Sequence, residues 1–190
     1  MAVTRGTNAG FVTAAPSADP GGSEVEISGF SWATKDASPA GNNKVTALGW
    51  HQTRADNEAL AYGCGIYSHD AVNDRPNTLI DTQTSGQSTT ANTPGWYSYT
   101  GLNISLTAST TYWVAATCAT EASKNNSVDS TVNAAERAAR VTATPLPSPW
   151  SGTSEYGRVV AIYAVYEAAG GGPLSNPFSR PFHGAFRRAM

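Results

Sequence analysis

The sequence predicts an all-β fold, an antiparallel β-sandwich with an extended arm at each end. First, β-branched and aromatic runs recur about every 10 residues through 62–118, separated by clusters of Gly, Pro, Asn and Asp. Second, residues 158–167 are apolar on both alternating faces, which is typical of a central strand. Third, the helix formers at 133–137 are too few for a stable helix.

The expected organisation is an N-terminal arm over residues 1–22, a sandwich over 23–168 and a C-terminal arm over 169–190. Pro16, Pro20, Gly21 and Gly22 punctuate the first segment. Residues 24–30 alternate polar and apolar side chains, as a half-buried strand does. The same reasoning places further strands at 45–50, 59–68, 78–82, 97–99, 104–106, 111–117, 140–144 and 158–167.

Three segments between these strands carry loop signals. Residues 35–43 are rich in Asp, Ser, Pro, Gly and Asn, and residues 130–140 are expected to form a loop or one helical turn. Three prolines at 145, 147 and 149 exclude a continuous strand, so we expect an extended loop that presents Trp150. The expected core contains the apolar centres of the strands, namely Leu48, Ile66, Leu79, Leu106, Val114 and Ile162.

Charge is scarce and unevenly placed. Charged residues make up 14% of the chain, against about 25% in ordinary soluble domains. A surface of small neutral polar residues suits packing against neighbouring subunits, or simply reflects Thr-rich strands. No acid follows Glu167, so the residues up to that point carry −5 and the remainder +3. This body has too few basic residues to bind nucleic acid.

The chain shows no membrane or export signal. The longest apolar run, 159–166, is too short to span a bilayer, and the first residues lack an apolar segment. We therefore expect a protein made in the cytoplasm. Cys64 and Cys118 fit that compartment as buried thiols, although both lie in predicted strands and could pair.

No catalytic, metal-binding or cofactor-binding motif emerges, so we do not expect an enzyme. His51, His69 and His183 are scattered without metal-ligand spacing. Ser68, His69 and Asp70 are adjacent on a strand and would point to alternating faces rather than form a relay. Asp70, Asn73 and Asp74 could hold Ca²⁺, but ordinary turn chemistry explains them better.

Aromatic residues offer a second possible binding function. Five Trp and eight Tyr could form a platform on which sugars stack. Tyr112 and Trp113 are neighbours on a predicted strand, so one of them must face the core. We expect most of the aromatic side chains to belong to the core or its rim.

The C-terminal segment is the expected partner-binding element. Ala168 to Gly172 has the composition of a linker, and a segment so rich in Pro and Gly cannot build a core of its own. It nevertheless holds three of the five Phe and three Arg. The predicted partner-binding residues are Phe178, Arg180, Phe182, Phe186, Arg187 and Arg188.

Residues 48–116 resemble a widespread family of jelly-roll-like β-sandwich modules. The resemblance rests on Leu48-Gly49, Gly65-Ile66-Tyr67-Ser68, Pro76-Asn77-Thr78-Leu79-Ile80, Gly95-Trp96 and the hairpin from Ile104 to Ala115. In that hairpin Ala108-Ser109 stands where the family pattern has Ala-Gly. Such modules occur in secreted bacterial surface proteins and in bacteriophage virion proteins, and they share no catalytic residues.

The resemblance, together with the two arms, favours a phage virion structural protein. We expect a capsid decoration (cement) protein that clamps neighbouring subunits with its arms, assembled in the host cytoplasm and located in the virion. The expected partners are a major capsid protein or another virion protein and further copies of this chain, with no nucleic acid, membrane or cofactor. The alternative is a carbohydrate-binding or adhesion module, such as a host-contact fibre or tail component.

Overall fold

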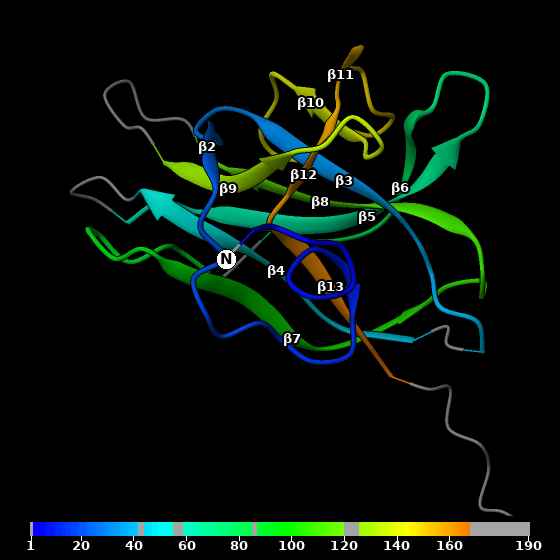
Figure 1. The fold of residues 1–190 in the computed structure, drawn as a ribbon, viewed down its shortest axis with the longest axis horizontal. Helices are drawn as coiled ribbons and strands as arrows, with labels where there is room; N and C mark the ends of the chain where they lie inside the picture. The colour runs from blue at the N-terminus through cyan, green and yellow to red at the C-terminus, as the bar shows by residue number, and fades with distance from the viewer. Residues whose placement is uncertain (1, 42–43, 55–58, 85–86, 120–125, 168–190) are drawn as a thin grey trace, which may run out of the picture.

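A computed structural model describes residues 2–41, 44–54, 59–84, 87–119 and 126–167, and these ranges form two β-sheets (Figure 1). The predicted all-β class is confirmed, since the described residues contain strands and no helix. Accordingly, these ranges contain no helix that is long and apolar enough to cross a membrane.

The larger sheet has seven strands. Its main path runs β1-β13-β4-β9-β12, while β7 pairs with β4 and β2 pairs with β9. β1 and β13 pair in parallel, whereas the other pairings in this sheet are antiparallel. The strands are β1 (Gly10–Val12), β2 (Ser23–Glu26), β4 (Lys44–Arg54), β7 (Gly95–Ser105), β9 (Ser127–Val132), β12 (Arg158–Val160) and β13 (Ile162–Glu167).

The second sheet has six strands in the order β11-β10-β3-β8-β5-β6, all antiparallel. Its central strands are long and apolar, and strand β8 lies between β3 and β5. The strands are β3 (Ser31–Ala37), β5 (Tyr62–Asp70), β6 (Arg75–Gln83), β8 (Thr111–Cys118), β10 (Ala138–Val141) and β11 (Ser154–Tyr156).

The main core lies between the two sheets. Leu48, Trp50 and Ile162 from the larger sheet pack in one cluster with Ile66 and Val114 from the smaller sheet, and all five are fully buried. Thr34 Oγ1 on β3 donates to the carbonyl of Val160 on β12 over 3.0 Å, which links the sheets directly. Because side chains alternate along a strand, each sheet also has an outer face.

The outer face of the smaller sheet carries a second apolar cluster. Trp113 alternates with Val114 and packs outward with Tyr67, Leu146 and Trp150. The loop from 142 to 153 covers this face, because the Trp150 amide donates to the Asn77 carbonyl over 2.9 Å. The prediction that this loop presents Trp150 is therefore wrong: the side chain is only 4% exposed.

The predicted core is largely confirmed. Leu48, Ile66, Leu106, Val114 and Ile162 are buried in the main cluster. Leu79 is the exception, since it is half-buried and packs against the outer cluster. The physical reason is that its strand, β6, lies at the edge of the smaller sheet, where fewer neighbours cover a side chain.

Several strand boundaries differ from the predictions. The two short strands expected at 97–99 and 104–106 are one strand, β7. Residues 35–37 extend β3 rather than begin a loop. Residues 130–132 and 138–140 belong to β9 and β10, so the loop expected at 130–140 is confined to 133–137. In each case pairing with a neighbouring strand overrides the weak local preference.

The expected central strand at 158–167 is divided at Ala161. β13 lies between β1 and β4 as predicted, but β12 ends the main path of the sheet, where it pairs with β9. Ala161 connects the two parts: its amide donates to the Asp129 carbonyl over 2.8 Å, and its carbonyl accepts from the His51 amide over 3.0 Å. Strands β4, β9 and β13 therefore meet at this residue.

The N-terminal segment is not a free arm. Residues 10–12 form β1 and pair with β13, so this part of the segment belongs to the larger sheet. Val3, Phe11 and Val12 are 2–4% exposed, and the Phe11 amide donates to Asp36 Oδ2 over 2.9 Å. Figure 1 shows this segment, in dark blue, lying beside β13. The expected C-terminal arm, 169–190, lies outside the described residues.

Candidate functional site

The predicted partner-binding residues Phe178, Arg180, Phe182, Phe186, Arg187 and Arg188 lie outside the described residues. The structure therefore leaves their proposed role as a prediction. What it does bring together is a different group of polar side chains, on the outer face of the larger sheet.

This group lies where β4, β9 and β13 meet. His51 comes from β4 and Asp129 from β9, and both backbones bond to Ala161. The neighbours of His51 along β4, Trp50 and Gln52, are fully buried, and Trp50 belongs to the cluster between the sheets. Alternation therefore places His51 on the opposite face of the sheet, toward the N-terminal segment.

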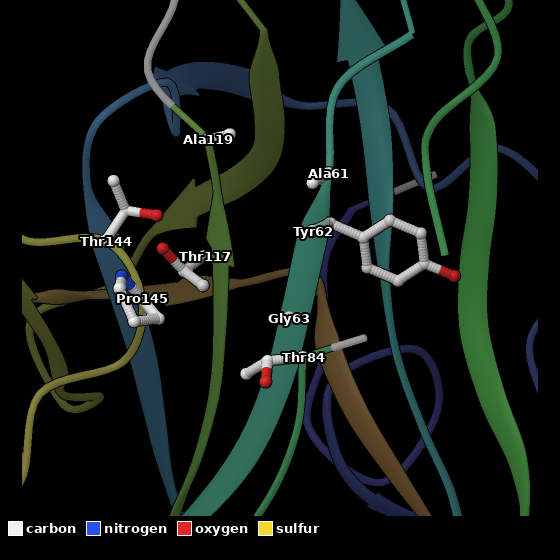
Figure 2. Close-up of a pocket in the computed structure, with 8 residues that line it drawn as sticks. All are labelled: Ala61, Tyr62, Gly63, Thr84, Thr117, Ala119, Thr144 and Pro145. Atoms are coloured by element: carbon white, nitrogen blue, oxygen red, sulfur yellow. The ribbon is translucent and has the colours of Figure 1, made fainter. Parts of the chain in front are cut away.

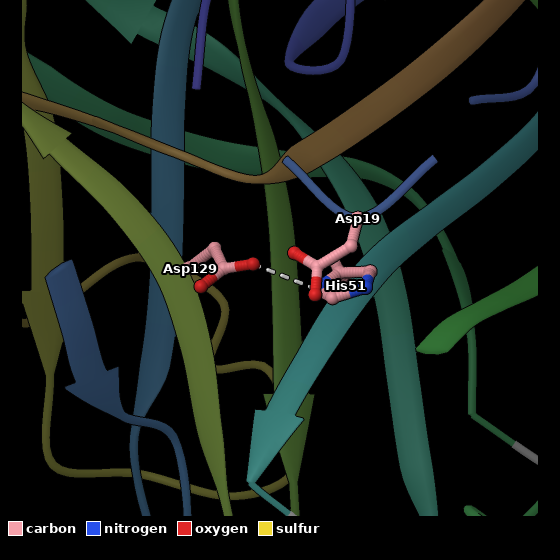
Figure 3. Close-up of side chains that lie close together, drawn as sticks. All are labelled: Asp19, His51 and Asp129. Carbon is pink, nitrogen blue, oxygen red and sulfur yellow. Dashed lines mark ion pairs between the residues drawn. The ribbon is translucent and has the colours of Figure 1, made fainter. Parts of the chain in front are cut away.

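His51 and Asp129 form a buried pair. Their side chains are 3% and 1% exposed, and Nδ1 of His51 lies 2.8 Å from Oδ2 of Asp129 (Figure 3). The separation is that of an ion pair, but the direction does not meet hydrogen-bond geometry. As a result neither carboxylate oxygen of Asp129 has a hydrogen-bond partner among the described residues.

Asp19 joins the pair from the N-terminal segment. One ligand atom from each of Asp19, His51 and Asp129 lies within 4.8 Å of the others, and Asp19 is exposed to solvent. Figure 3 shows the Asp19 carboxylate beside the His51 ring. We call these three residues the His51 cluster.

The segment that carries Asp19 is held in place locally. The Gly21 amide donates to Asp19 Oδ1 over 2.7 Å, and Trp96 Nε1 donates to the Ala18 carbonyl over 3.0 Å. Trp96 faces His51 across the β4–β7 ladder, and the two rings meet edge to face at 4.8 Å. One tryptophan thus contacts both the imidazole and the segment that covers it.

Chemically, the cluster suits the binding of a cation. Burial of an ionised carboxylate is unfavourable unless a counter-charge or a metal compensates it. His51 supplies a charge only when it is protonated. Two carboxylates and an imidazole around one point are also a familiar type of metal-ligand set.

Sequence reasoning missed this cluster. Asp19 and Asp129 are 32 and 78 positions from His51, so no local spacing could reveal them. The only local signal is Asp129 itself, an acidic residue in the middle of a strand, where Asp is uncommon.

The residues that sequence reasoning weighed as a catalytic relay do not form one. Ser68 Oγ accepts from the Thr78 amide, and His69 Nδ1 accepts from Trp113 Nε1 over 3.1 Å. Asp70 accepts from the amides of Val72 and Asn73, which confirms its predicted role in a turn. Ser68, His69 and Asp70 therefore bond to other residues in these contacts and not to one another.

Asp74, the other acid of the predicted calcium loop, has basic neighbours instead. Its carboxylate lies 2.6 Å from Lys35 Nζ and 3.6 Å from Arg137 Nε, with His69 Nε2 at 3.7 Å. These ion pairs compensate its charge, and turn chemistry explains the rest of the loop.

Cys64 and Cys118 are free thiols rather than a disulfide, which agrees with the first of the two alternatives that the sequence left open. Both are completely buried, on the neighbouring strands β5 and β8. Burial raises the pKa of both thiols, that of Cys118 to about 11. The residues directly opposite them in the ladder are Ala116 and Tyr62, so the two cysteines do not face each other.

The aromatic residues are mainly core, as expected. Trp32, Trp50, Trp113 and Trp150 are at most 4% exposed, and Trp96 is half-buried against His51. In the described part of the chain, no tryptophan is free to serve as an open platform for a sugar ring.

A pocket of about 360 Å³ lies at one end of β5 and β8 (Figure 2). Its walls are small residues and three threonines, Thr84, Thr117 and Thr144, together with Pro145 and the start of β5. The described residues that line the pocket carry hydroxyl groups and no charge.

Comparisons with known proteins identify no relative: no family model, no curated protein and no solved structure matches the chain.

Proposed function

We propose that the protein is a virion structural protein, a capsid decoration (cement) protein with a jelly-roll-like sandwich that attaches through its C-terminal segment. The supporting observation is that the sandwich closes its own core within residues 2–167. Among the described large apolar side chains only Val72, Ile80 and Val132 are exposed. The core is therefore complete without the three Phe that follow Glu167, and we assign these side chains to a partner.

The energetics favour binding that combines apolar and charged contacts. Each of Phe178, Phe182 and Phe186 offers roughly 1.5–3 kcal/mol if it fills a pocket. Ordering a free segment costs roughly 1–2 kcal/mol per residue, which three rings cannot offset. Backbone hydrogen bonds and pairing of Arg180, Arg187 and Arg188 with an acidic surface must contribute. Prolines in the segment lower the cost by restricting the free chain.

The acidic surface could belong to a second copy or to another virion protein. Residues up to Glu167 carry −5 and the segment beyond carries +3, so copies of this chain are complementary to one another. Decoration of a shell by a homo-oligomer, a dimer or trimer, is therefore part of the proposal.

The test is incorporation into particles. A chain lacking residues 173–190 is expected to fold, with an unchanged β circular dichroism spectrum and melting temperature, but to be absent from particles purified from the source. Mass spectrometry of the particles measures its copy number against that of the full chain.

A charge variant provides the graded comparison. Arg187→Ala with Arg188→Ala should weaken incorporation without abolishing it. The loss relative to the full chain should be largest at low salt, because salt screens the attraction that these two arginines contribute. Lys44→Ala, a change in a half-exposed cation of β4, serves as the matched control and should incorporate normally.

Normal incorporation of the truncated chain would exclude this segment as the anchor. Binding to glycans without any particle association would favour the adhesion alternative.

A further inference from the structure

We propose that Asp19, His51 and Asp129 bind a divalent transition-metal ion of the Zn²⁺ class, which fastens the N-terminal segment to the outer face of the larger sheet. This site is independent of the proposed virion function, since it lies within the sandwich and involves none of the C-terminal residues.

Asp129 carries a buried carboxylate that lacks hydrogen bonds in the described part of the chain. Its side chain is 1% exposed, yet neither carboxylate oxygen has a hydrogen-bond partner in the described ranges. Buried carboxylates normally accept several hydrogen bonds, form a compensated ion pair or coordinate a metal. Within the described ranges its ion-pair partner is His51, which is charged only when protonated. A divalent cation would compensate Asp129 and Asp19 together.

The cluster offers a mixed donor set. Two carboxylates supply hard oxygen ligands and His51 supplies an imidazole nitrogen. Mg²⁺ and Ca²⁺ prefer sites made only of oxygen, whereas imidazole favours Zn²⁺ and its first-row neighbours. Three protein ligands leave a fourth position for water on the side where Asp19 meets solvent.

The ligand atoms of Asp19, His51 and Asp129 also lie close enough together to share one ion. Ligand atoms around a tetrahedral zinc lie about 3.3 Å apart, given metal–ligand bonds of about 2.0–2.1 Å. The three ligand atoms here lie within 4.8 Å of one another. To complete the site, Asp19 would move inward and the 2.8 Å separation of His51 Nδ1 from Asp129 Oδ2 would widen slightly. Asp19 is the ligand best able to move, because it is exposed and His51 and Asp129 are fixed on neighbouring strands.

The surroundings also orient the ligands. The Gly21 amide binds one oxygen of Asp19, and Trp96 contacts both the His51 ring and the Ala18 carbonyl. Groups that hold metal ligands in position in this way strengthen metal binding. A bound ion would therefore join three distant parts of the chain, at residues 19, 51 and 129.

The experiment measures thermal unfolding of the full chain after chelator treatment, with and without added ZnCl₂ or MgCl₂. At a Zn²⁺ concentration about 100-fold above the dissociation constant, we expect the melting temperature to rise by about 5–10 °C. Mg²⁺ at the same concentration should leave it unchanged.

Two variants test the ligands. Asp19→Asn keeps an oxygen that can accept from the Gly21 amide, so it should melt like the wild type without metal but lose most of the Zn²⁺ shift. Asp129→Asn removes the buried carboxylate that pairs with His51, so it should show no Zn²⁺ shift. Glu155→Gln, which neutralises an exposed acid on β11, is the control and should retain the full shift.

Co²⁺ provides a readout that excludes the thiols. Bound at the His51 cluster it should give ligand-field absorption without a thiolate charge-transfer band, and Asp19→Asn should abolish that absorption. Absence of any Zn²⁺ shift in the wild type, or an equal shift in wild type and Asp19→Asn, would overturn the proposal. If Asp129→Asn does not fold, the exposed Asp19→Asn variant alone decides the question.

Discussion

At the scale of single residues, Ser109 adopts a backbone conformation that is strained for a residue with a side chain. It lies in the turn between β7 and β8 with a φ of 52°, a left-handed conformation that favours glycine. The turn is kept in place from outside, because the Ser109 amide donates to the Ser38 carbonyl over 3.0 Å.

We therefore expect Ser109→Gly to stabilise the protein. Relief of the left-handed strain contributes about 1–2 kcal/mol, and the greater chain entropy of glycine removes about 0.5–1 kcal/mol of that. A net gain of about 0.5–1 kcal/mol should raise the melting temperature by about 1–4 °C. Ala108→Gly is the control and should lower it, because Ala108 is not among the residues with positive φ.

At the scale of elements, the loop from 142 to 153 acts as a cover for the smaller sheet. Trp150 meets Tyr67 edge to face with ring centroids 5.1 Å apart, and the Tyr67 hydroxyl donates to the Pro147 carbonyl over 2.6 Å. Three prolines prevent this loop from forming a strand, but they do not prevent its side chains from packing on the outer face of the smaller sheet.

Trp150→Ala should accordingly destabilise the protein by about 3–5 kcal/mol, the usual cost of removing a buried large aromatic side chain. Denaturant unfolding followed by circular dichroism measures the loss. Val132→Ala, at a side chain that is 66% exposed, should change the stability by no more than about 0.5 kcal/mol. Similar effects for the two variants would show that the loop does not cover the sheet in solution.

At the scale of the whole molecule, buried phenols and thiols determine the response to alkaline pH. Burial raises the pKa of Tyr99 to about 12 and that of Cys118 to about 11, and it raises the pKa of Tyr62, Tyr67 and Cys64 as well. The folded state therefore keeps protons that the unfolded chain releases near pH 9 for thiols and pH 10 for phenols.

The sign of the effect follows from linkage. Between the unfolded and the folded pKa values the folded state binds more protons, so stability decreases as pH rises. We expect full stability below about pH 9, a steady loss above it and cooperative alkaline unfolding. Melting temperatures across this range measure the slope, and Tyr99→Phe should make it shallower. A slope that is unchanged in Tyr99→Phe would contradict the assignment.

The sequence by itself determined the features that depend on local pattern. Period-two alternation and turn residues are properties of a few neighbouring residues, so the all-β class, the burial of Ile162 and the turn role of Asp70 could be predicted from them. The C-terminal residues Phe178 to Arg188 also stand out by composition alone, and their role remains a prediction.

Only the tertiary structure decided which distant segments meet. The pairing of β1 with β13 turns an expected arm into part of the sheet, and the break at Ala161 brings His51 and Asp129 together beneath Asp19. Such contacts depend on strand order and register, which are selected by the burial of the whole core rather than by any short stretch of sequence. For this reason the His51 cluster, unlike the strands that carry it, has no signature in the sequence.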